Sequence, residues 1–507
     1  RDDDGHGVPA MLSRLAAHFS RYSLASLLVT LASIVSFPFL TRIFPVADYG
    51  MMSLIGVLVT ATAAVGKLGL QQAALRFYSE VRAGQSPWSL PQYEATVYMG
   101  LAGFGTATAL LWMGGLSVLP DSLFSSPENH HLLYLVAPLA LLQCLSSSVV
   151  NQLRARELSG VLSLYSVVQR YMGLALMLLA LLYVSTTLWG FYGAQIVSET
   201  LCLVVLAGWF FRREPWSPRD FSMPLLQVLL RYSLPLVAME LSSVMLSLGD
   251  RVLIQRMLGS EWLGVYSAPY NLCDYIGAVL VTAFTGAITP MVLRLWADEG
   301  ETATQKFLQR VFHLYLLFAI PMVAGVSAVS EPLLALVASE KYRAGAAIIP
   351  WVIGGVALQG LFPVTSAGLQ IRKRSGLVLL SILSAAGLNV VLNLLLIPFL
   401  GIEGAAIATL LAYALMNALA AWQGRATVPV RPEWRRVLAF TVAAGVMYVA
   451  LGYIHFDRDL PTLVVRMAVG AVIYAVAVLA LDAEARVMAT QVLARFGLGR
   501  GRGTKQG

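Results

Sequence analysis

Charged residues are scarce in this chain of 507 residues. Asp, Glu, Lys and Arg make up 12% of it, whereas 58% of its residues are hydrophobic, and the mean hydropathy is +0.73. Soluble domains contain about 25% charged residues, so the deficit excludes that class and predicts a polytopic membrane protein. The net charge of +8 is then a topology signal and gives no reason to expect a nucleic-acid partner.

Cysteine and histidine are also rare, with three and six residues. Cys144, Cys202 and Cys273 fall in apolar runs without paired spacing, so we expect packing roles for them, with no disulfide framework, metal site or cofactor. His130 and His131 form the only histidine pair, and no phosphate-binding loop is present. A membrane enzyme, such as a glycan polymerase or ligase, is therefore the weakest interpretation of the chain.

Apolar runs dominate what is present. About fourteen of them are long enough, at roughly 20 residues, to cross ~30 Å of hydrocarbon as helices. We expect an all-α polytopic membrane protein with about 14 transmembrane helices. Its spans are predicted near residues 20–41, 49–69, 93–118, 131–151, 160–183, 188–211, 233–255, 262–290, 307–328, 345–367, 376–398, 402–422, 435–454 and 461–481.

Lys and Arg are distributed unevenly between the two sides of the predicted spans. With both termini in the cytoplasm, 27 of the 35 Lys and Arg lie in cytoplasmic segments and six in outward loops, as the positive-inside rule requires. Arg14 and Arg21 precede the first apolar run, as in a signal peptide. That run continues to Phe39 without a cleavage pattern, so we expect an uncleaved span.

Two sequence patterns recur at nearly the same distance. Arg42, Gly50 and Ser53 in TRIFPVADYGMMS reappear 214 residues later in QRMLGSEWLGVYS, and WGFYGAQIVS reappears 211 residues later as LGIEGAAIAT. This indicates an internal duplication. We expect two six-helix lobes, at residues 12–211 and 233–422, related by a pseudo-two-fold axis along the membrane normal, and an additional helix pair at residues 435–481.

Polar residues recur every three or four positions on several predicted spans, which places each set on one helix face. The sets are Ser23, Ser26, Thr30, Ser33; Ser163, Ser166, Arg170, Gly173; Tyr192, Gln195, Glu199, Cys202; Glu240, Ser243, Ser247, Asp250; and Ser267, Tyr270, Asp274, Gly277. A cavity between the lobes is one explanation. Helix packing is the alternative for the Ser and Gly positions.

Arg170 and Glu199 are the most informative members of these sets. Each is predicted roughly 15 Å inside the membrane, where an ionisable group costs at least ~2.5 kcal/mol unless it meets water or a partner. They either form a structural ion pair or line a cavity in which Arg170 binds an anionic substrate.

Four further charged residues are candidates for binding a substrate or a coupling ion, because of their predicted depth in the membrane or their position at its edge. Glu240 and Asp274 are predicted at similar depths, and two acids sharing a cavity could bind a proton or a sodium ion. Lys67 and Arg76 flank the inner end of the second span, where they could attract an anionic headgroup or simply follow the positive-inside rule. The alternative for each acid is a hydrogen bond to a neighbouring group.

Asp250 and Arg251 are predicted close to the outer interface. Adjacent residues do not face each other on a helix. We therefore expect helix capping or interface anchoring from them.

Several segments resemble one family. TRIFPVADYG, KLGLQQAALRFYSE, SLGDRVLIQRMLGSEWLGVYSAPYNL, SEKYRAGAAIIPWVIGGVALQG and LNVVLNLLLIPFLGIEGAAIATLLAYAL are similar to segments of the bacterial polysaccharide-export flippases of the multidrug/oligosaccharidyl-lipid/polysaccharide (MOP) superfamily. The resemblance covers residues 12 to 425. It implies alternating-access transport of an undecaprenyl-pyrophosphate-linked oligosaccharide from the inner to the outer leaflet of the bacterial cytoplasmic membrane.

The resemblance also implies roles for residues and partners. Arg170 would bind the pyrophosphate, and the sugar contacts would come from Gln169, Gln195, Asn271 and Asn389, each of which could equally bridge helices. The lipid tail would stay in the membrane, and polysaccharide polymerase or export proteins are possible partners. Lipid II flippases resemble the chain less, because their cavity arginines in the first and eighth spans are replaced here by Ser, Thr and Asp274.

Two further interpretations remain open at this point. A cation-coupled drug antiporter of the same fold would suit paired buried acids, whereas Arg170 favours an anionic lipid. The second open interpretation is that the chain is a noncatalytic subunit of a polysaccharide secretion complex.

Overall fold

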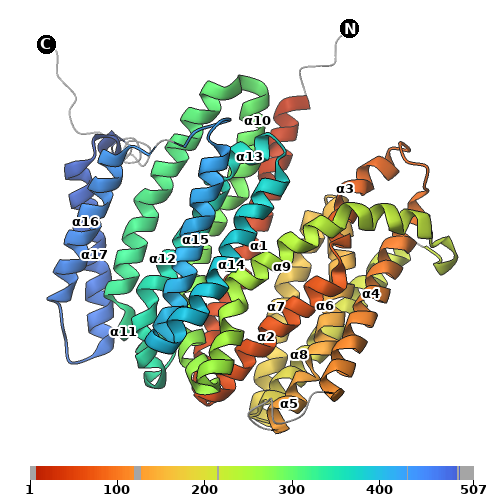
Figure 1. The fold of residues 1–507 in the computed structure, drawn as a ribbon, viewed down its shortest axis with the longest axis horizontal. Coiled ribbons are helices and arrows are strands. Elements are labelled where there is room, and N and C mark those ends of the chain that lie inside the picture. The colour runs from red at the N-terminus through yellow and green to blue at the C-terminus, as the bar shows by residue number, and fades with distance from the viewer. Residues whose placement is uncertain (1–6, 119–126, 214–215, 431, 488–489, 491–507) are drawn as a thin grey trace, which may run out of the picture. The chain divides into compact units, whose positions relative to one another are not determined.

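The chain is a multi-pass, helical membrane protein. The computed structural model describes residues 7–118, 127–213, 216–430, 432–487 and 490, and within them it contains helices and no strand (Figure 1). Thirteen helices there are long and apolar enough to cross a membrane. The predicted fold class is confirmed.

The helices follow the predicted spans closely. They are α1 Gly7–Ile43, α2 Val46–Lys67, α3 Leu70–Arg82, α4 Leu90–Val118, α5 Pro127–Leu133, α6 Val136–Ala155, α7 Ser159–Tyr183, α8 Leu188–Arg213, α9 Met223–Leu258, α10 Ser260–Ala328, α11 Ser330–Val337, α12 Ile349–Thr365, α13 Ala367–Ile371, α14 Ser375–Leu400, α15 Ile402–Gly424, α16 Trp434–Gly452 and α17 Asp459–Leu481. Two short 3₁₀ helices cover Pro218–Asp220 and Glu340–Ile348.

The eighth and ninth predicted spans, at residues 262–290 and 307–328, both lie in α10. The backbone of α10 departs from helical geometry at Gly300, where φ is 80° and two helices meet. Glycine adopts positive φ without a Cβ clash, which explains the break at this residue.

The chain forms two compact units. The first contains Arg1–Val279 and Leu379–Ala412, and the second contains Leu280–Val378 and Tyr413–Gly507. Packing thus groups parts of both predicted lobes in the first unit. The division into lobes at residues 12–211 and 233–422 with a helix pair at 435–481 stays a prediction.

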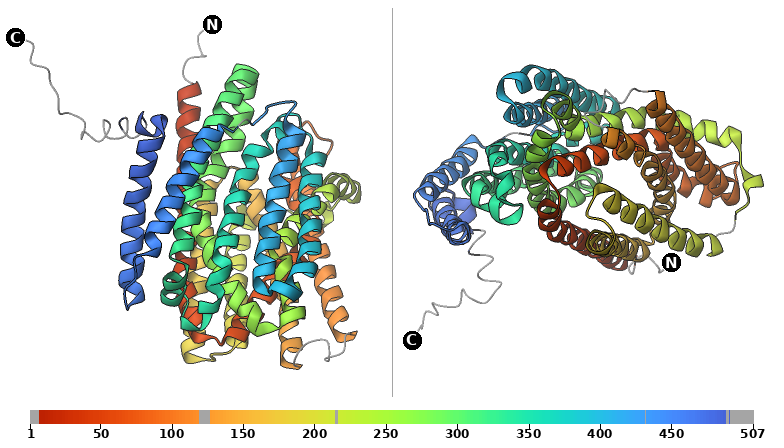
Figure 2. Two further views of the ribbon diagram at one scale, coloured as in Figure 1. Left: turned by 60° about the vertical axis from the view of Figure 1, so that its left-hand side comes forward. Right: turned by 90° about the horizontal axis from the view of Figure 1, so that it is seen from below.

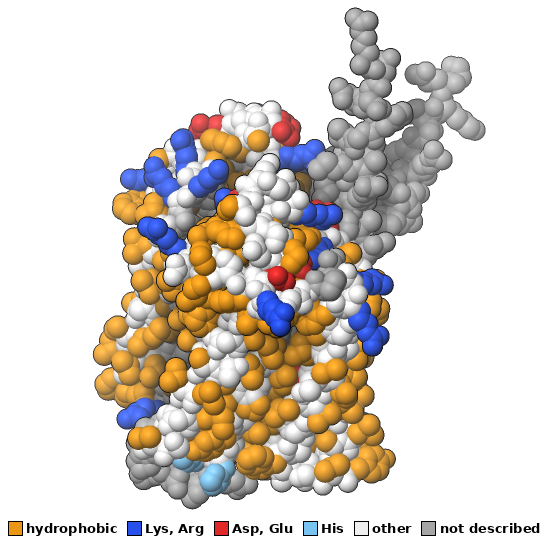
Figure 3. Space-filling model, turned by 90° about the vertical axis from the view of Figure 1, so that its right-hand side faces the viewer, with side chains coloured by type: hydrophobic (Ala, Val, Ile, Leu, Met, Phe, Trp, Pro, Cys, Tyr) orange, Lys and Arg blue, Asp and Glu red, His pale blue; other side chains and the backbone are white. Residues whose placement is uncertain are grey.

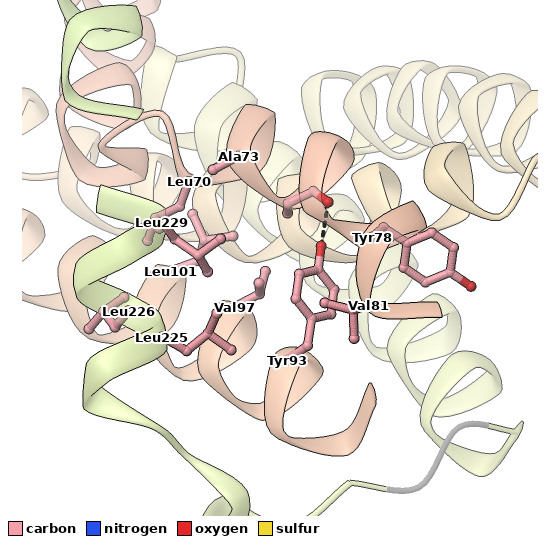
Figure 4. Packing of buried hydrophobic residues seen from close by; sticks show 11 residues of the cluster. Leu70, Ala73, Tyr78, Val81, Tyr93, Val97, Leu101, Leu225, Leu226 and Leu229 are labelled. Carbon is pink, nitrogen blue, oxygen red and sulfur yellow. Dashed lines mark hydrogen bonds between the residues drawn. The ribbon is translucent and has the colours of Figure 1, made fainter. Parts of the chain in front are cut away.

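In the first unit, α1 packs on α7 and α7 on α8, while α2 contacts α4, α6 and α9. A buried apolar cluster joins α3, α4 and α9, with Tyr93 of α4 donating a hydrogen bond to the Ala74 carbonyl oxygen of α3 (Figure 4). Leu225, Leu226 and Leu229 belong to this cluster. The first turns of α9, which the sequence did not predict as part of the seventh span, are therefore anchored on α3 and α4.

The helix α3 lies in a segment that the sequence analysis left between spans. Its apolar face is buried, including Leu70, Ala73 and Val81, while Arg76 on the opposite face is 58% exposed in its side chain. This amphipathic pattern is typical of a helix at a membrane surface. On the face in Figure 3, most Lys and Arg side chains gather towards the upper end, above a broad hydrophobic region.

In the second unit, α16 and α17 lie side by side (Figure 2). Arg466 of α17 is buried there and donates hydrogen bonds to the carbonyl oxygens of Ile454 and Ala328, at 2.9 and 2.6 Å. An apolar cluster that includes Ile288, Tyr315 and Leu361 packs α10 against α12. Arg466 falls inside the predicted span at residues 461–481, and these backbone oxygens together with the His455 ring nitrogen are its hydrogen-bond partners there.

Candidate functional site

A cavity of about 370 Å³ opens between α1, α7 and α8 in the first unit. Its wall consists of Val29, Ser36, Leu40, Ser166, Gln169, Arg170, Gly173, Leu174, Met177, Phe191, Gln195, Ser198 and Glu199. The predicted polar stripes on α7 and α8 thus supply its two charged groups and the Gln195 amide, and Gln169 of α7 adds a second amide. Ser33 lies next to the wall through its bond to Arg170, and the side chain of Ser23 lies outside the described residues.

Arg170 projects from α7 into this cavity. Its Nη2 donates a hydrogen bond of 2.7 Å to the Ser33 hydroxyl of α1, and among the described residues no other hydrogen-bond partner of Arg170 is found. The residue is exposed. A guanidinium has five N–H donors in a planar fork, so most of the donor capacity of Arg170 is available to a ligand.

Glu199 of α8 lies on the same wall and accepts a hydrogen bond from the Gln169 side-chain amide of α7. In the described part of the chain no ion pair within 4.0 Å joins Glu199 to Arg170. The structural ion pair that the sequence left open is therefore absent from this conformation. Gln195, a helical turn before Glu199, also lines the cavity.

A second polar site joins α2, α9 and α10. Asp250 and Arg251 of α9 are 1% and 2% exposed. The three donor bonds of Arg251 reach the Ser53 hydroxyl at 3.0 Å, the Asn271 amide oxygen at 3.1 Å and the Ser247 carbonyl oxygen at 3.2 Å. Because neither residue is at an exposed surface, the predicted role in capping or interface anchoring is wrong.

Asp250 is satisfied by neighbours of its own. It accepts hydrogen bonds from the Tyr266 hydroxyl of α10 and from the Arg251 backbone N–H, the latter at 2.8 Å. Its carboxylate also lies 3.9 Å from the Arg251 guanidinium. Tyr49 of α2 completes the network, because its hydroxyl oxygen accepts a hydrogen bond of 3.0 Å from the Asn271 side-chain amide. We call these residues, Tyr49, Ser53, Asp250, Arg251, Tyr266 and Asn271, the α2/α9/α10 network.

The duplicated glycines meet beside this network. A Cβ on Gly50 would lie 2.2 Å from the Ser260 carbonyl oxygen, and one on Gly264 would lie 2.0 Å from the Val46 carbonyl oxygen. Ser260 and Gly264 each follow Val46 and Gly50 by the repeat distance of 214 residues. The two contacts are thus equivalent, as in an interface between two-fold-related surfaces, and only glycine allows the backbones to come so close.

The other predicted site residues lie elsewhere. Asn271 belongs to the α2/α9/α10 network. Asn389 is 1% exposed and donates to Thr409 of α15 at 3.2 Å, so in this conformation it bridges helices. Arg76 lies on the exposed face of α3, with Glu80 at 3.9 Å and the Tyr232 ring beneath it.

Lys67 and Glu240 form an ion pair between α2 and α9 at 2.9 Å. Glu240 also accepts a hydrogen bond of 2.9 Å from the Gln71 amide of α3. Glu240, one of the two acids predicted to bind a coupling ion, thus has a lysine and a glutamine amide as partners. The charges acting on Asp274 are instead those of Arg251 and Asp250, so the two acids have different neighbours.

Comparison with known proteins fits this geometry. A model of the family described as "polysaccharide biosynthesis protein" matches residues 39–347. The chain belongs to this family.

Two curated proteins are similar to this chain over part of its length. The probable low-salt glycan biosynthesis flippase Agl15 of Haloferax volcanii is 22% identical over 254 residues, 50% of this chain and 54% of that protein. The succinoglycan biosynthesis transport protein ExoT of Rhizobium meliloti is 26% identical over 306 residues, 59% of this chain and 57% of that protein. The chain therefore matches little more than half of each relative.

Solved structures share the fold of this polysaccharide biosynthesis protein. The lipid II flippase MurJ in an inward closed conformation superposes with a TM-score of 0.73 at 12% identity, covering 94% of this chain and 99% of that one. An inward-facing multidrug resistance MATE family transporter of the MOP superfamily has a TM-score of 0.62 at 16% identity, covering 81% and 97%. The predicted fold is confirmed by these structures, and the predicted relation to polysaccharide-export proteins agrees with the family model.

Proposed function

We propose that this polysaccharide biosynthesis protein is a flippase for a lipid-linked, anionic glycan. The observation that carries the proposal is the cavity between α1, α7 and α8, in which Arg170 keeps most of its donors available beside two glutamine amides. We further propose that the substrate is an undecaprenyl-pyrophosphate-linked oligosaccharide moving from the inner to the outer leaflet of the bacterial cytoplasmic membrane. Both termini would be cytoplasmic.

The residues of the cavity have the chemistry that such a substrate requires. A guanidinium binds pyrophosphate oxygens through paired, charge-assisted hydrogen bonds. The amides of Gln169 and Gln195 and the hydroxyls of Ser166 and Ser198 can bind sugar hydroxyls, since each offers a donor or an acceptor. The polyprenyl tail can remain in lipid while the polar part crosses. Transport of this kind needs no catalytic group, so we propose a noncatalytic transporter.

The α2/α9/α10 network supplies a closure for alternating access. It lies at the ends of the helices that the charge distribution predicts to face outward. Because α2 belongs to the first predicted lobe and α9 and α10 to the second, outward opening would separate Ser53 and Tyr49 from Arg251 and Asn271. The glycine contact between α2 and α10 would open with it.

Glu240 and Asp274 differ as candidates for ion coupling. Glu240 is paired with Lys67, whereas Asp274 has no hydrogen bond within the described residues. Asp274 is therefore the better candidate for binding a proton or a sodium ion. Polysaccharide polymerase and export proteins are the partners that we expect, because the flipped glycan is their substrate.

Reconstitution tests the proposal. Wild-type protein in vesicles should move a labelled lipid-linked oligosaccharide to the opposite leaflet, and Arg170→Ala should slow this movement by roughly tenfold or more, the scale of one charge-assisted bond. Arg372→Ala, which removes an exposed cation far from the cavity wall in sequence, is the matched control. Unchanged movement in Arg170→Ala would contradict the proposal.

Export of an organic cation is a second candidate, favoured by Glu199 in the same cavity. The two candidates differ in which charge they need. A cation antiporter would lose transport of a cationic dye in Glu199→Gln and retain it in Arg170→Ala. A glycan flippase would show no dye transport in the wild-type protein.

A further inference from the structure

The second unit contains a polar pocket of about 390 Å³ between α10 and the beginning of α16. Its lining comprises Lys306, Gln309, Arg310, His313, Glu433, Arg436, Glu484 and Val487. Neither the cavity around Arg170 nor the α2/α9/α10 network includes any of these residues. The pocket is therefore a separate feature of the molecule.

Most polar groups of this pocket already have partners. Arg436 pairs with Glu433 at 2.9 Å and with Glu484. His313 is buried, and its Nε2 accepts the Glu433 backbone N–H at 3.0 Å while its Nδ1 lies 2.7 Å from the Gln309 carbonyl oxygen. Both ring nitrogens are used, which fixes the first turn of α16 on α10.

Lys306 and Arg310 are the exception. They lie four residues apart on α10, so both face the pocket from one side of the helix. Across the described ranges neither has an ion pair or a hydrogen bond. Two like charges at this spacing destabilise a helix unless an anion lies between them, and this pocket therefore favours an anionic ligand.

A separate apolar groove of about 480 Å³ lies between α10, α12 and α16. On α10 the face that carries Lys306, Arg310 and His313 continues at intervals of three or four residues to Leu316 and Ile320. The rest of its wall includes Val323 of α10 and Thr441, Ala444, Gly445 and Tyr448 of α16. The two helices thus present first a cationic pocket and then an apolar groove, which is the polarity order of a membrane lipid.

We propose that this combined site binds an anionic phospholipid of the bilayer. The phosphate would lie beside Lys306 and Arg310, and an acyl chain would lie in the groove next to Gly445. Basic pockets between membrane helices bind anionic headgroups by this complementarity. On α10 the groove residue Leu316 follows the pocket residue His313 by three positions, and on α16 Thr441 follows Arg436 by five. A lipid has both a charged and an apolar part, so it fits this order of residues better than a free phosphate ion does.

Native mass spectrometry of the full-length protein in detergent tests the site. Wild-type protein should retain phosphatidylglycerol in preference to zwitterionic phosphatidylethanolamine. Lys306→Ala/Arg310→Ala should weaken phosphatidylglycerol binding by roughly thirty-fold, since each cation contributes a comparable share of the attraction. Arg372→Ala/Arg374→Ala, which removes two exposed cations of the same unit outside the pocket, should bind as the wild type does.

A groove variant distinguishes a lipid from an ion. No atom lies within 4 Å of a Cβ placed on Gly445, so Gly445→Leu can be accommodated while it fills the groove. It should reduce phosphatidylglycerol binding and leave any effect of inorganic phosphate on thermal unfolding unchanged. Equal phosphatidylglycerol binding by the wild type and the Lys306/Arg310 double variant would overturn the proposal. So would protection by inorganic phosphate together with full lipid binding in Gly445→Leu.

Discussion

The cavity around Arg170 and the α2/α9/α10 network both lie in the first unit and each contain an arginine and an acid, yet their charges are satisfied differently. Arg251 is 2% exposed and bonds three side-chain or backbone oxygens as well as lying beside Asp250. Arg170 is exposed and bonds one serine hydroxyl. A buried charge whose donors are used by the protein has a structural role, and a charge with unused donors can bind a ligand.

Arg251→Ala should have the largest effect on stability. It would leave the Asp250 carboxylate buried beside Tyr266 without its cation, and breaking a buried pair costs about 3–5 kcal/mol. Thermal unfolding in detergent should show a clearly lower midpoint than in the wild type. Asp250→Asn in the same background should recover part of the loss, because it removes the unpaired charge. An unfolding midpoint equal to that of the wild type would show that the network does not stabilise this conformation.

Gly264→Val should have the next largest effect. The new Cβ would overlap the Val46 carbonyl oxygen, and overpacking of this kind costs about 1–3 kcal/mol. The accessibility of single cysteines introduced near the outward ends of α2 and α10 should rise as the contact separates. Gly56→Val is the matched control on α2, since nothing lies within 4 Å of its Cβ. Equal cysteine accessibility in the two variants would mean that the glycine contact does not hold the outward ends of α2 and α10 together.

Asp274→Asn and Glu240→Gln should separate the two acids by function. If Asp274 binds the coupling ion, Asp274→Asn should flatten the pH or sodium dependence of glycan transport. Glu240→Gln should keep that dependence, because Glu240 is held by Lys67 and Gln71. Transport by reconstituted vesicles at several pH values and sodium concentrations is the measurement. An unchanged dependence in Asp274→Asn would remove this residue from the coupling hypothesis.

Much of the fold could be predicted from the sequence, because helices that cross lipid must be long and apolar. Hydropathy predicted the spans, and the repeat containing Gly50 and Gly264 predicted a pair whose contacts the structure shows to be equivalent. The amphipathic helix α3 was not predicted, because its 13 residues are too few and too polar to resemble a span.

The candidate site could be predicted only in part. Stripes on α7 and α8 indicated Arg170, Gln195 and Glu199, because residues of one helix face share an environment, whereas Gln169 was implied only by the family resemblance. The partners of Glu240 and Arg251 could not be predicted, since Lys67 and Ser53 are 173 and 198 residues away. Adjacency was also misleading for Asp250 and Arg251. Both are buried because other helices cover them, although they do not face each other on α9.

Binding of the lipid-linked oligosaccharide to purified protein tests the central claim most directly. Titration of wild-type protein and Arg170→Ala, with thermal unfolding of each measured in parallel, separates recognition from stability. The account predicts affinity weaker by roughly tenfold or more in Arg170→Ala with an unchanged unfolding midpoint. Equal affinity in the two proteins would contradict it, because the cavity would then contain no group that recognises the anion.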